Sequence, residues 1–131
     1  MGIEKIAYIF VGGGIGSVLR YMAVSGMQRH APDYPWGTVC VNVTGSFLIG
    51  IAWALCNTFD LSPNSRTFVF VGLLGGFTTF SSFSLDTMNL LNAGKITGAL
   101  SYAVGTTLSG ILAVFLGFFL TKYMLSLFKL A

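Results

Sequence analysis

One short segment of this chain places hydroxyl and aromatic side chains together inside an apolar run. It extends from Gly75 to Asp86 and reads Gly-Gly-Phe-Thr-Thr-Phe-Ser-Ser-Phe-Ser-Leu-Asp. Two adjacent glycines weaken a helix, because glycine loses most backbone freedom on folding. Hydroxyls and ring edges then crowd the residues that follow. The pattern predicts a helix that is broken near its centre, beside a binding site.

Two further stripes of polar residues occur at helical spacing. Thr38 and Asn42 share one helix face, and Tyr102 and Thr106 repeat the pattern later in the chain. Amide and hydroxyl groups donate hydrogen bonds, and phenylalanine rings present a positive edge. Hydrogen bonding between helices explains any one stripe, but the three together favour a polar path for an anion. The near absence of acidic residues within these segments argues against a cation path.

Arg20 is a positive charge within the first apolar segment. It could raise the local concentration of anions at the mouth of a pore, or it could extend to the membrane surface. The sequence leaves both interpretations open.

The composition defines the class of protein. Of the 131 residues, 54% are hydrophobic and 8% are charged, with a mean hydropathy of +0.80. Soluble domains carry about 25% charged residues, so we expect a single integral membrane domain over residues 1–131. The basic residues are not clustered, which argues against nucleic-acid binding. No pair of carboxylates, metal-ligand cluster or nucleophile–base set can be assembled, so we do not expect an enzyme.

Four segments are long and apolar enough to cross a bilayer, which takes about 20 residues. Alternation with period two is absent from them, so an all-α protein is expected. The predicted spans are residues 4–28, 36–58, 66–91 and 96–127.

Basic residues are almost evenly divided between the two sides of the predicted membrane domain. One side carries Lys5, Arg66, Lys122 and Lys129, and the other carries Arg20, Arg29 and Lys95. Such a weak bias barely specifies an orientation. We therefore expect dual topology and an antiparallel homodimer within the lipid bilayer. Glycines four residues apart, Gly12 with Gly16 and Gly72 with Gly76, would let helices approach closely.

The Gly75–Ser84 segment, with Gly37-Thr38 and Asn42 before it and Leu19-Arg20 in the first span, resembles the Fluc (CrcB) family of fluoride channels. The similarity covers essentially the whole chain. It implies a passive, selective fluoride channel of the cell inner membrane, which exports fluoride from the cytoplasm. It also implies an antiparallel dimer with two pores.

The resemblance implies roles for particular residues. Phe80 and Phe83 match the paired pore rings, and Asn42 matches the pore amide. The other expected pore residues are Thr38, Thr79, Ser82, Tyr102 and Thr106. A structural sodium ion is expected at the dimer axis, on the backbone carbonyls of Gly75 and Thr78. Asp86 stands where many relatives carry glutamate, and its role stays open.

Two other functions compete with this interpretation. A small proton-coupled multidrug exporter would also have four spans and dual topology, but it needs a membrane-embedded carboxylate early in the chain. Spans 1 and 2 supply none beyond Glu4. The other alternative is a structural protein whose polar stripes only join helices.

Overall fold

The computed structural model describes residues 2–128, and within them every regular element is helical. Residue 1 and residues 129–131, including Lys129 of the charge comparison, lie outside the described residues. The elements in chain order are α1 (Ile3–Gln28), α2 (Trp36–Thr58), α3 (Pro63–Arg66), the π-helical stretch η1 (Thr67–Leu74), α4 (Gly75–Phe77), α5 (Phe80–Asn92) and α6 (Ile96–Leu127).

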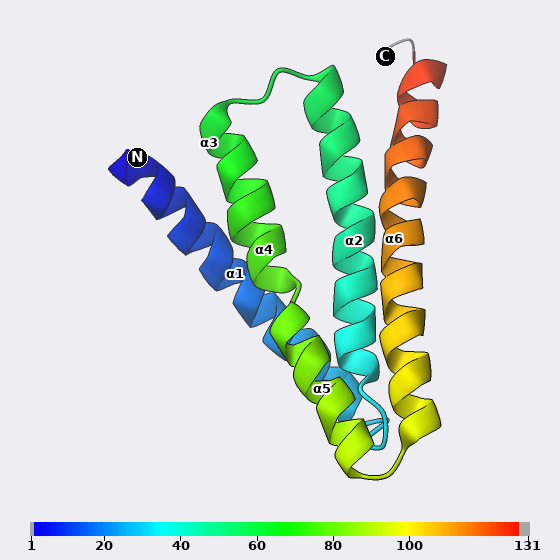
Figure 1. Ribbon diagram of the computed structural model, residues 1–131. Helices are drawn as coiled ribbons and strands as arrows, with labels where there is room; N and C mark the ends of the chain where they lie inside the picture. Colours follow the sequence, from blue (N-terminus) through cyan, green and yellow to red (C-terminus); the bar gives the residue numbers. More distant parts are fainter. Residues whose placement is uncertain (1, 129–131) are drawn as a thin grey trace.

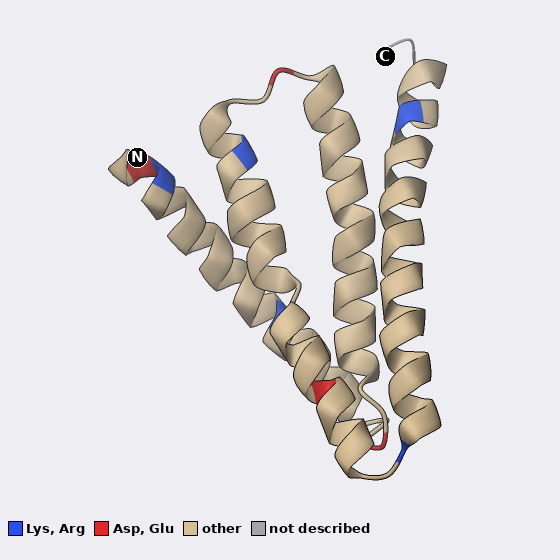
Figure 2. Cartoon of the chain, in the orientation of Figure 1, with Lys and Arg blue, Asp and Glu red and all other residues tan. Residues whose placement is uncertain are grey.

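These elements form four membrane-length helical segments, as the sequence predicts. Their bounds are Ile3–Gln28, Trp36–Thr58, Pro63–Asn92 and Ile96–Leu127. The third segment, span 3 from here on, comprises α3, η1, α4 and α5. The start of α1 and the end of α6 lie toward the same end of the bundle as the α2–α3 loop (Figure 1). Charged residues lie mostly near the ends of the helices, leaving long uncharged stretches between them (Figure 2).

Local sequence signals explain where span 3 begins and ends. Ser62 caps its start by accepting a hydrogen bond from the Ser65 amide at 3.1 Å, and Pro63 follows at the first helical position. At the other end Gly94 adopts a φ of 73°, which favours glycine. The Lys95 amide then donates to the Leu90 carbonyl at 2.9 Å and closes the helix.

Span 3 is broken near its centre, but the break lies after the glycines and not at them. Gly75 and Gly76 remain helical, whereas Thr78 and Thr79 have extended backbones, with ψ angles of 159° and 119°. The glycines serve packing instead. A Cβ added at Gly76 would lie 2.6 Å from the Gly13 carbonyl of α1, so only glycine permits this approach.

Small residues allow two pairs of helical segments to pack closely. The pairs are α1 with the first half of span 3, and α2 with α6. The first half of span 3 lies against α1, where an added Cβ at Gly12 would lie 2.8 Å from the Phe68 carbonyl. Helices α2 and α6 lie side by side (Figure 1), and Cβ atoms at Gly50 or Gly117 would meet the backbone of the opposite helix. The spacing of Gly12 with Gly16 and of Gly72 with Gly76 thus predicts close helix packing correctly, and this packing is within one protomer. The contacts at Gly50 and Gly117 were not predicted.

A candidate anion pathway at the break in span 3

The side chain of Asn42 in α2 stabilises the extended backbone at the break. Asn42 Nδ2 donates to the Thr79 carbonyl at 3.0 Å, and the Thr79 amide donates to Asn42 Oδ1 at 2.8 Å. This pair replaces the helical hydrogen bonds that the extended Thr79 backbone gives up, as a buried backbone group requires. The Asn42 side chain keeps one N–H that neither contact uses.

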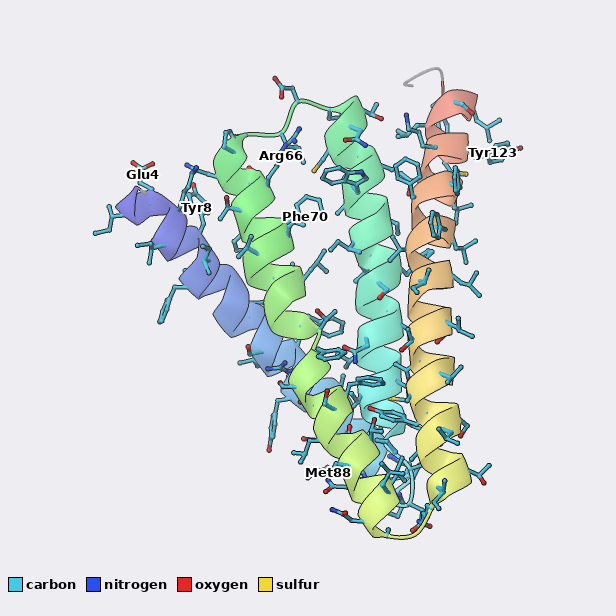
Figure 3. All side chains as sticks on the ribbon, in the orientation of Figure 1. Glu4, Tyr8, Arg66, Phe70, Met88 and Tyr123 are labelled. Atoms are coloured by element: carbon cyan, nitrogen blue, oxygen red, sulfur yellow. The ribbon has the colours of Figure 1, made fainter. Side chains whose placement is uncertain are left out.

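The polar groove, as we call it, is a cavity of about 420 Å³ between α2, span 3 and α6. It brings together most of the site residues expected from the sequence. The polar and aromatic residues that line it include Asn42, Thr78, Thr79, Phe80, Phe83 and Thr106, and Gly75 also borders it. Ser46, Thr107 and mostly apolar residues from α2, η1 and α6 line the rest. They include Phe70, whose side chain lies on the α2-facing side of span 3 (Figure 3).

The two phenylalanines belong to a row of aromatic rings. The Phe80 and Phe83 ring centroids are 5.5 Å apart, and those of Phe83 and Tyr102 are 5.2 Å apart. Tyr102 is fully buried, whereas Phe80 is 79% exposed. The row therefore extends from the buried Tyr102 ring of α6 to the exposed Phe80 ring at the break.

Thr38 and Tyr102 lie beside the polar groove, and both bind Asp86. The Thr38 hydroxyl donates to Asp86 Oδ2 at 2.7 Å, and the Tyr102 hydroxyl donates to the same oxygen at 3.1 Å. A carboxylate within a membrane span is costly unless it is paired, and these two donors offset that cost. Each hydroxyl has one proton, so in this arrangement neither donates to an anion.

Two other hydroxyls, those of Thr106 and Ser82, donate no hydrogen bond within residues 2–128. Thr106 is 7% exposed, and its Oγ1 is buried with no hydrogen-bond partner among residues 2–128. Thr79 Oγ1 donates to Ser82 Oγ at 3.1 Å, and the Ser82 hydroxyl donates to no group within the described chain. A buried unpartnered hydroxyl is uncommon in a folded protein and indicates a ligand or water at that position.

Both helix ends at the break carry partial charge. The Thr79 hydroxyl accepts from the Ser82 amide at 3.1 Å and caps α5, whose amide end favours negative charge. The first half of span 3 ends in carbonyl groups, which favour a cation. Arg20 already uses one of them, because its Nη1 donates to the Thr78 carbonyl at 3.2 Å. Arg20 therefore reaches the break itself, which neither interpretation of the sequence anticipated.

Sequence reasoning missed two contacts at this site. It identified Asp86 and Arg20 as unusual charges but assigned neither its partner. The available signal was the cost of an unpaired charge within a membrane span. That cost implies that each charge has a partner, but it does not identify the partner.

Four membrane-length helical segments, the third of them broken, define a small multi-pass membrane protein with a polar groove between α2, span 3 and α6. Residues 7–118 match the family model described as CrcB-like protein, Camphor Resistance (CrcB). A protein of Parabacteroides distasonis named fluoride-specific ion channel FluC is 44% identical, with 95% of this chain and 98% of that protein covered. Proteins with the same name from Rhizobium meliloti and Thermus thermophilus are 47% and 45% identical, over 93% and 90% of this chain and 99% and 94% of theirs.

The chain therefore belongs to the CrcB family.

Proposed function

We propose that this protein is a passive fluoride channel that exports fluoride from the cytoplasm across the cell inner membrane. The observation that carries the proposal is the buried Thr106 hydroxyl, which has no hydrogen-bond partner within the described part of the chain and lies in the same groove as Phe80, Phe83 and Asn42. The names of the relatives support fluoride as the permeating ion. As a channel, the protein carries out no covalent reaction.

Fluoride holds its hydration shell strongly, so a pathway must replace that shell with donors. The Thr106 hydroxyl and the remaining N–H of Asn42 supply them within the groove, and the ring edges of Phe80 and Phe83 add weaker contacts. The Ser82 hydroxyl, which does not line the groove, would add a donor beside it through its contact with Thr79. The Thr38 and Tyr102 hydroxyls donate hydrogen bonds to Asp86, and this contact fixes the positions of both side chains beside the pathway. Discrimination against chloride follows from a narrow path and from donor spacing.

The pathway requires a second copy of the chain in the opposite orientation. Phe80 is 79% exposed on the groove, and a lone protomer leaves this ring and the groove uncovered. An antiparallel partner would cover both and would form a second, equivalent pore. The near balance of basic residues between the two sides supports insertion in both orientations. Reporter fusions at the C-terminus should therefore detect both orientations, and a single orientation would contradict the antiparallel dimer.

The carbonyls of Gly75 and Thr78 would hold a structural sodium ion between the two protomers. The amide that would pair with the Gly75 carbonyl in a continuous helix is that of Thr79, which donates to Asn42 instead. Carbonyls of unwound membrane helices suit sodium, so the atoms present fit the ion. When bound, the ion would neutralise the partial charge of the carbonyl ends. Arg20, at the same break, would attract anions toward the pathway.

Fluoride efflux from proteoliposomes, followed with a fluoride electrode, tests the proposed function. We expect rapid fluoride efflux when valinomycin balances the charge with potassium, and no chloride efflux above that of protein-free liposomes. A fluoride–proton exchanger would release fluoride without valinomycin, and a structural protein would release none. Either result would contradict the proposal. Gly14→Ala is the matched control, because an added Cβ meets nothing within 4 Å there.

A further inference from the structure

Arg20 connects α1 to the break in span 3 through a backbone carbonyl. Its Nη1 lies 3.2 Å from the Thr78 oxygen, 58 positions along the chain. The Thr78 residue has an extended backbone, with φ −81° and ψ 159°. The guanidinium therefore binds a backbone carbonyl at the end of the first half of span 3.

The Thr78 carbonyl is available because its helical donor has been diverted. In a continuous helix it would accept from the Ser82 amide. That amide donates to Thr79 Oγ1 at 3.1 Å. A carbonyl oxygen has two lone pairs, and Arg20 uses one of them. The other remains for a second positively charged group.

We propose that Arg20 and the structural cation share the Thr78 carbonyl, and that Arg20 thereby sets the affinity of the site for sodium. This inference rests on the proposed sodium site of the dimer. Two unit charges about 5 Å apart repel by an energy that corresponds to about 300-fold in an equilibrium constant, for an effective dielectric constant near 20. Each protomer contributes one such arginine. Arg20 is thus a positioning residue that satisfies the carbonyl in a lone protomer and weakens sodium binding in the dimer.

The proposal predicts in which direction neutral substitutions of Arg20 change the affinity for sodium. A purely structural role of Arg20 predicts the opposite direction. If Arg20 only stabilised the backbone at the break, neutral substitutions of Arg20 would make the Thr78 carbonyl less well ordered and would weaken sodium binding. If Arg20 shares the carbonyl with sodium, neutral substitutions remove a repelling charge and strengthen it. The affinity for sodium therefore separates the two roles, independently of any change in stability.

Thermal unfolding of the full-length dimer, titrated with sodium chloride against N-methyl-D-glucamine chloride, measures this affinity. We expect Arg20→Gln to lower the half-saturating sodium concentration at least tenfold. Arg20→Lys, which keeps the charge, should stay within about threefold of the wild type. Should Arg20→Gln fail to yield folded protein, Arg20→Met carries the same expectation, because it is neutral and of similar length.

Arg66 provides the matched control. Its Nη2 donates to the Cys56 carbonyl at 3.0 Å, the same kind of contact at the end of α2. Arg66→Gln should lower the unfolding temperature without shifting the sodium dependence. An unchanged or weaker sodium affinity in the neutral Arg20 variants, or no sodium dependence in any variant, would overturn the inference. Fluoride efflux by the wild type would persist in that case, whereas its absence would contradict the proposed function instead.

Discussion

The two halves of span 3 are built in different ways. Residues 63–77 pack through glycines, with the backbone of α1 close to Gly72 and Gly76. Residues 80–92 are positioned by side-chain hydrogen bonds, because Asn42 holds Thr79 and Asp86 binds Thr38 and Tyr102. The first half leaves almost no space on its α1-facing side. Both halves border the polar groove, but the second contributes the two aromatic rings, Phe80 and Phe83, that follow the break.

We expect this difference to separate residues that are needed for folding from residues that are needed for transport. Substitutions in the glycine-packed half should act mainly on the folded state, since backbone atoms cannot move aside cheaply. Substitutions of Phe80 and Phe83 in the second half should act mainly on the anion pathway, since these side chains border the polar groove. Substitutions of Asp86, which binds Thr38 and Tyr102, should act mainly on stability.

Gly16→Val should prevent formation of most of the folded protein. An added Cβ would meet the Leu73 carbonyl and would lie 2.8 Å from the Phe77 amide nitrogen. The yield of monodisperse protein in detergent measures the effect. Gly14→Val makes the same change where nothing lies within 4 Å and should yield folded protein. Equal yields from both variants would contradict the glycine packing.

Phe80→Ile and Phe83→Ile should each abolish fluoride efflux while the dimer remains folded. Isoleucine keeps apolar volume but lacks the ring edge that contacts an anion. Phe80 is 79% exposed, so its replacement should change the unfolding temperature little. Efflux from proteoliposomes and thermal unfolding are measured on the same preparations. Normal efflux from both variants would refute the assignment of the rings.

Asn42→Asp should lower fluoride efflux at least tenfold. The substitution replaces an N–H donor with an acceptor and places it opposite the Thr79 carbonyl, 3.0 Å away in the wild type. Losing a hydrogen bond at a buried polar group costs about 1–3 kcal/mol. Asn57→Asp makes the same change at an exposed site on α2 and should leave efflux unchanged. Wild-type efflux from Asn42→Asp would count against a role for Asn42.

Asp86→Ala should destabilise the protein by about 1–3 kcal/mol, because it leaves the buried hydroxyls of Thr38 and Tyr102 unpaired. Asp86→Asn keeps an acceptor oxygen and should cost less. Thermal unfolding compares the two, with Asp60→Asn in the exposed α2–α3 loop as the control. Equal stability of Asp86→Ala and Asp86→Asn would mean that the two hydroxyls do not depend on Asp86.

Much of this fold follows from local sequence signals. The predicted bounds of α2 and α6, 36–58 and 96–127, agree with the structure, because prolines, a glycine turn and charges mark their ends. The break in span 3 was expected from Gly75 and Gly76, yet it falls at Thr78 and Thr79. Glycine has two uses, flexibility and close approach, and the sequence does not separate them.

The partners of the two charges could not be predicted. The contact between Arg20 and Thr78 spans 58 positions, and that between Thr38 and Asp86 spans 48. Both depend on how the helices cross, which helical periodicity does not specify. The same holds for Thr106, which the sequence placed on a polar stripe. Only the packed structure reveals that its hydroxyl has no partner among the described residues.

The central claim is that the Thr106 hydroxyl faces the path of the anion. Fluoride efflux from proteoliposomes containing Thr106→Val tests it most directly, because valine has nearly the same shape and lacks only the hydroxyl. The loss of one hydrogen bond to an anion, about 1.5–3 kcal/mol, predicts a decrease of about tenfold or more. Thr106→Ser should retain most of the efflux, and both variants should unfold near the wild-type temperature. Efflux at the wild-type rate from Thr106→Val would contradict the account.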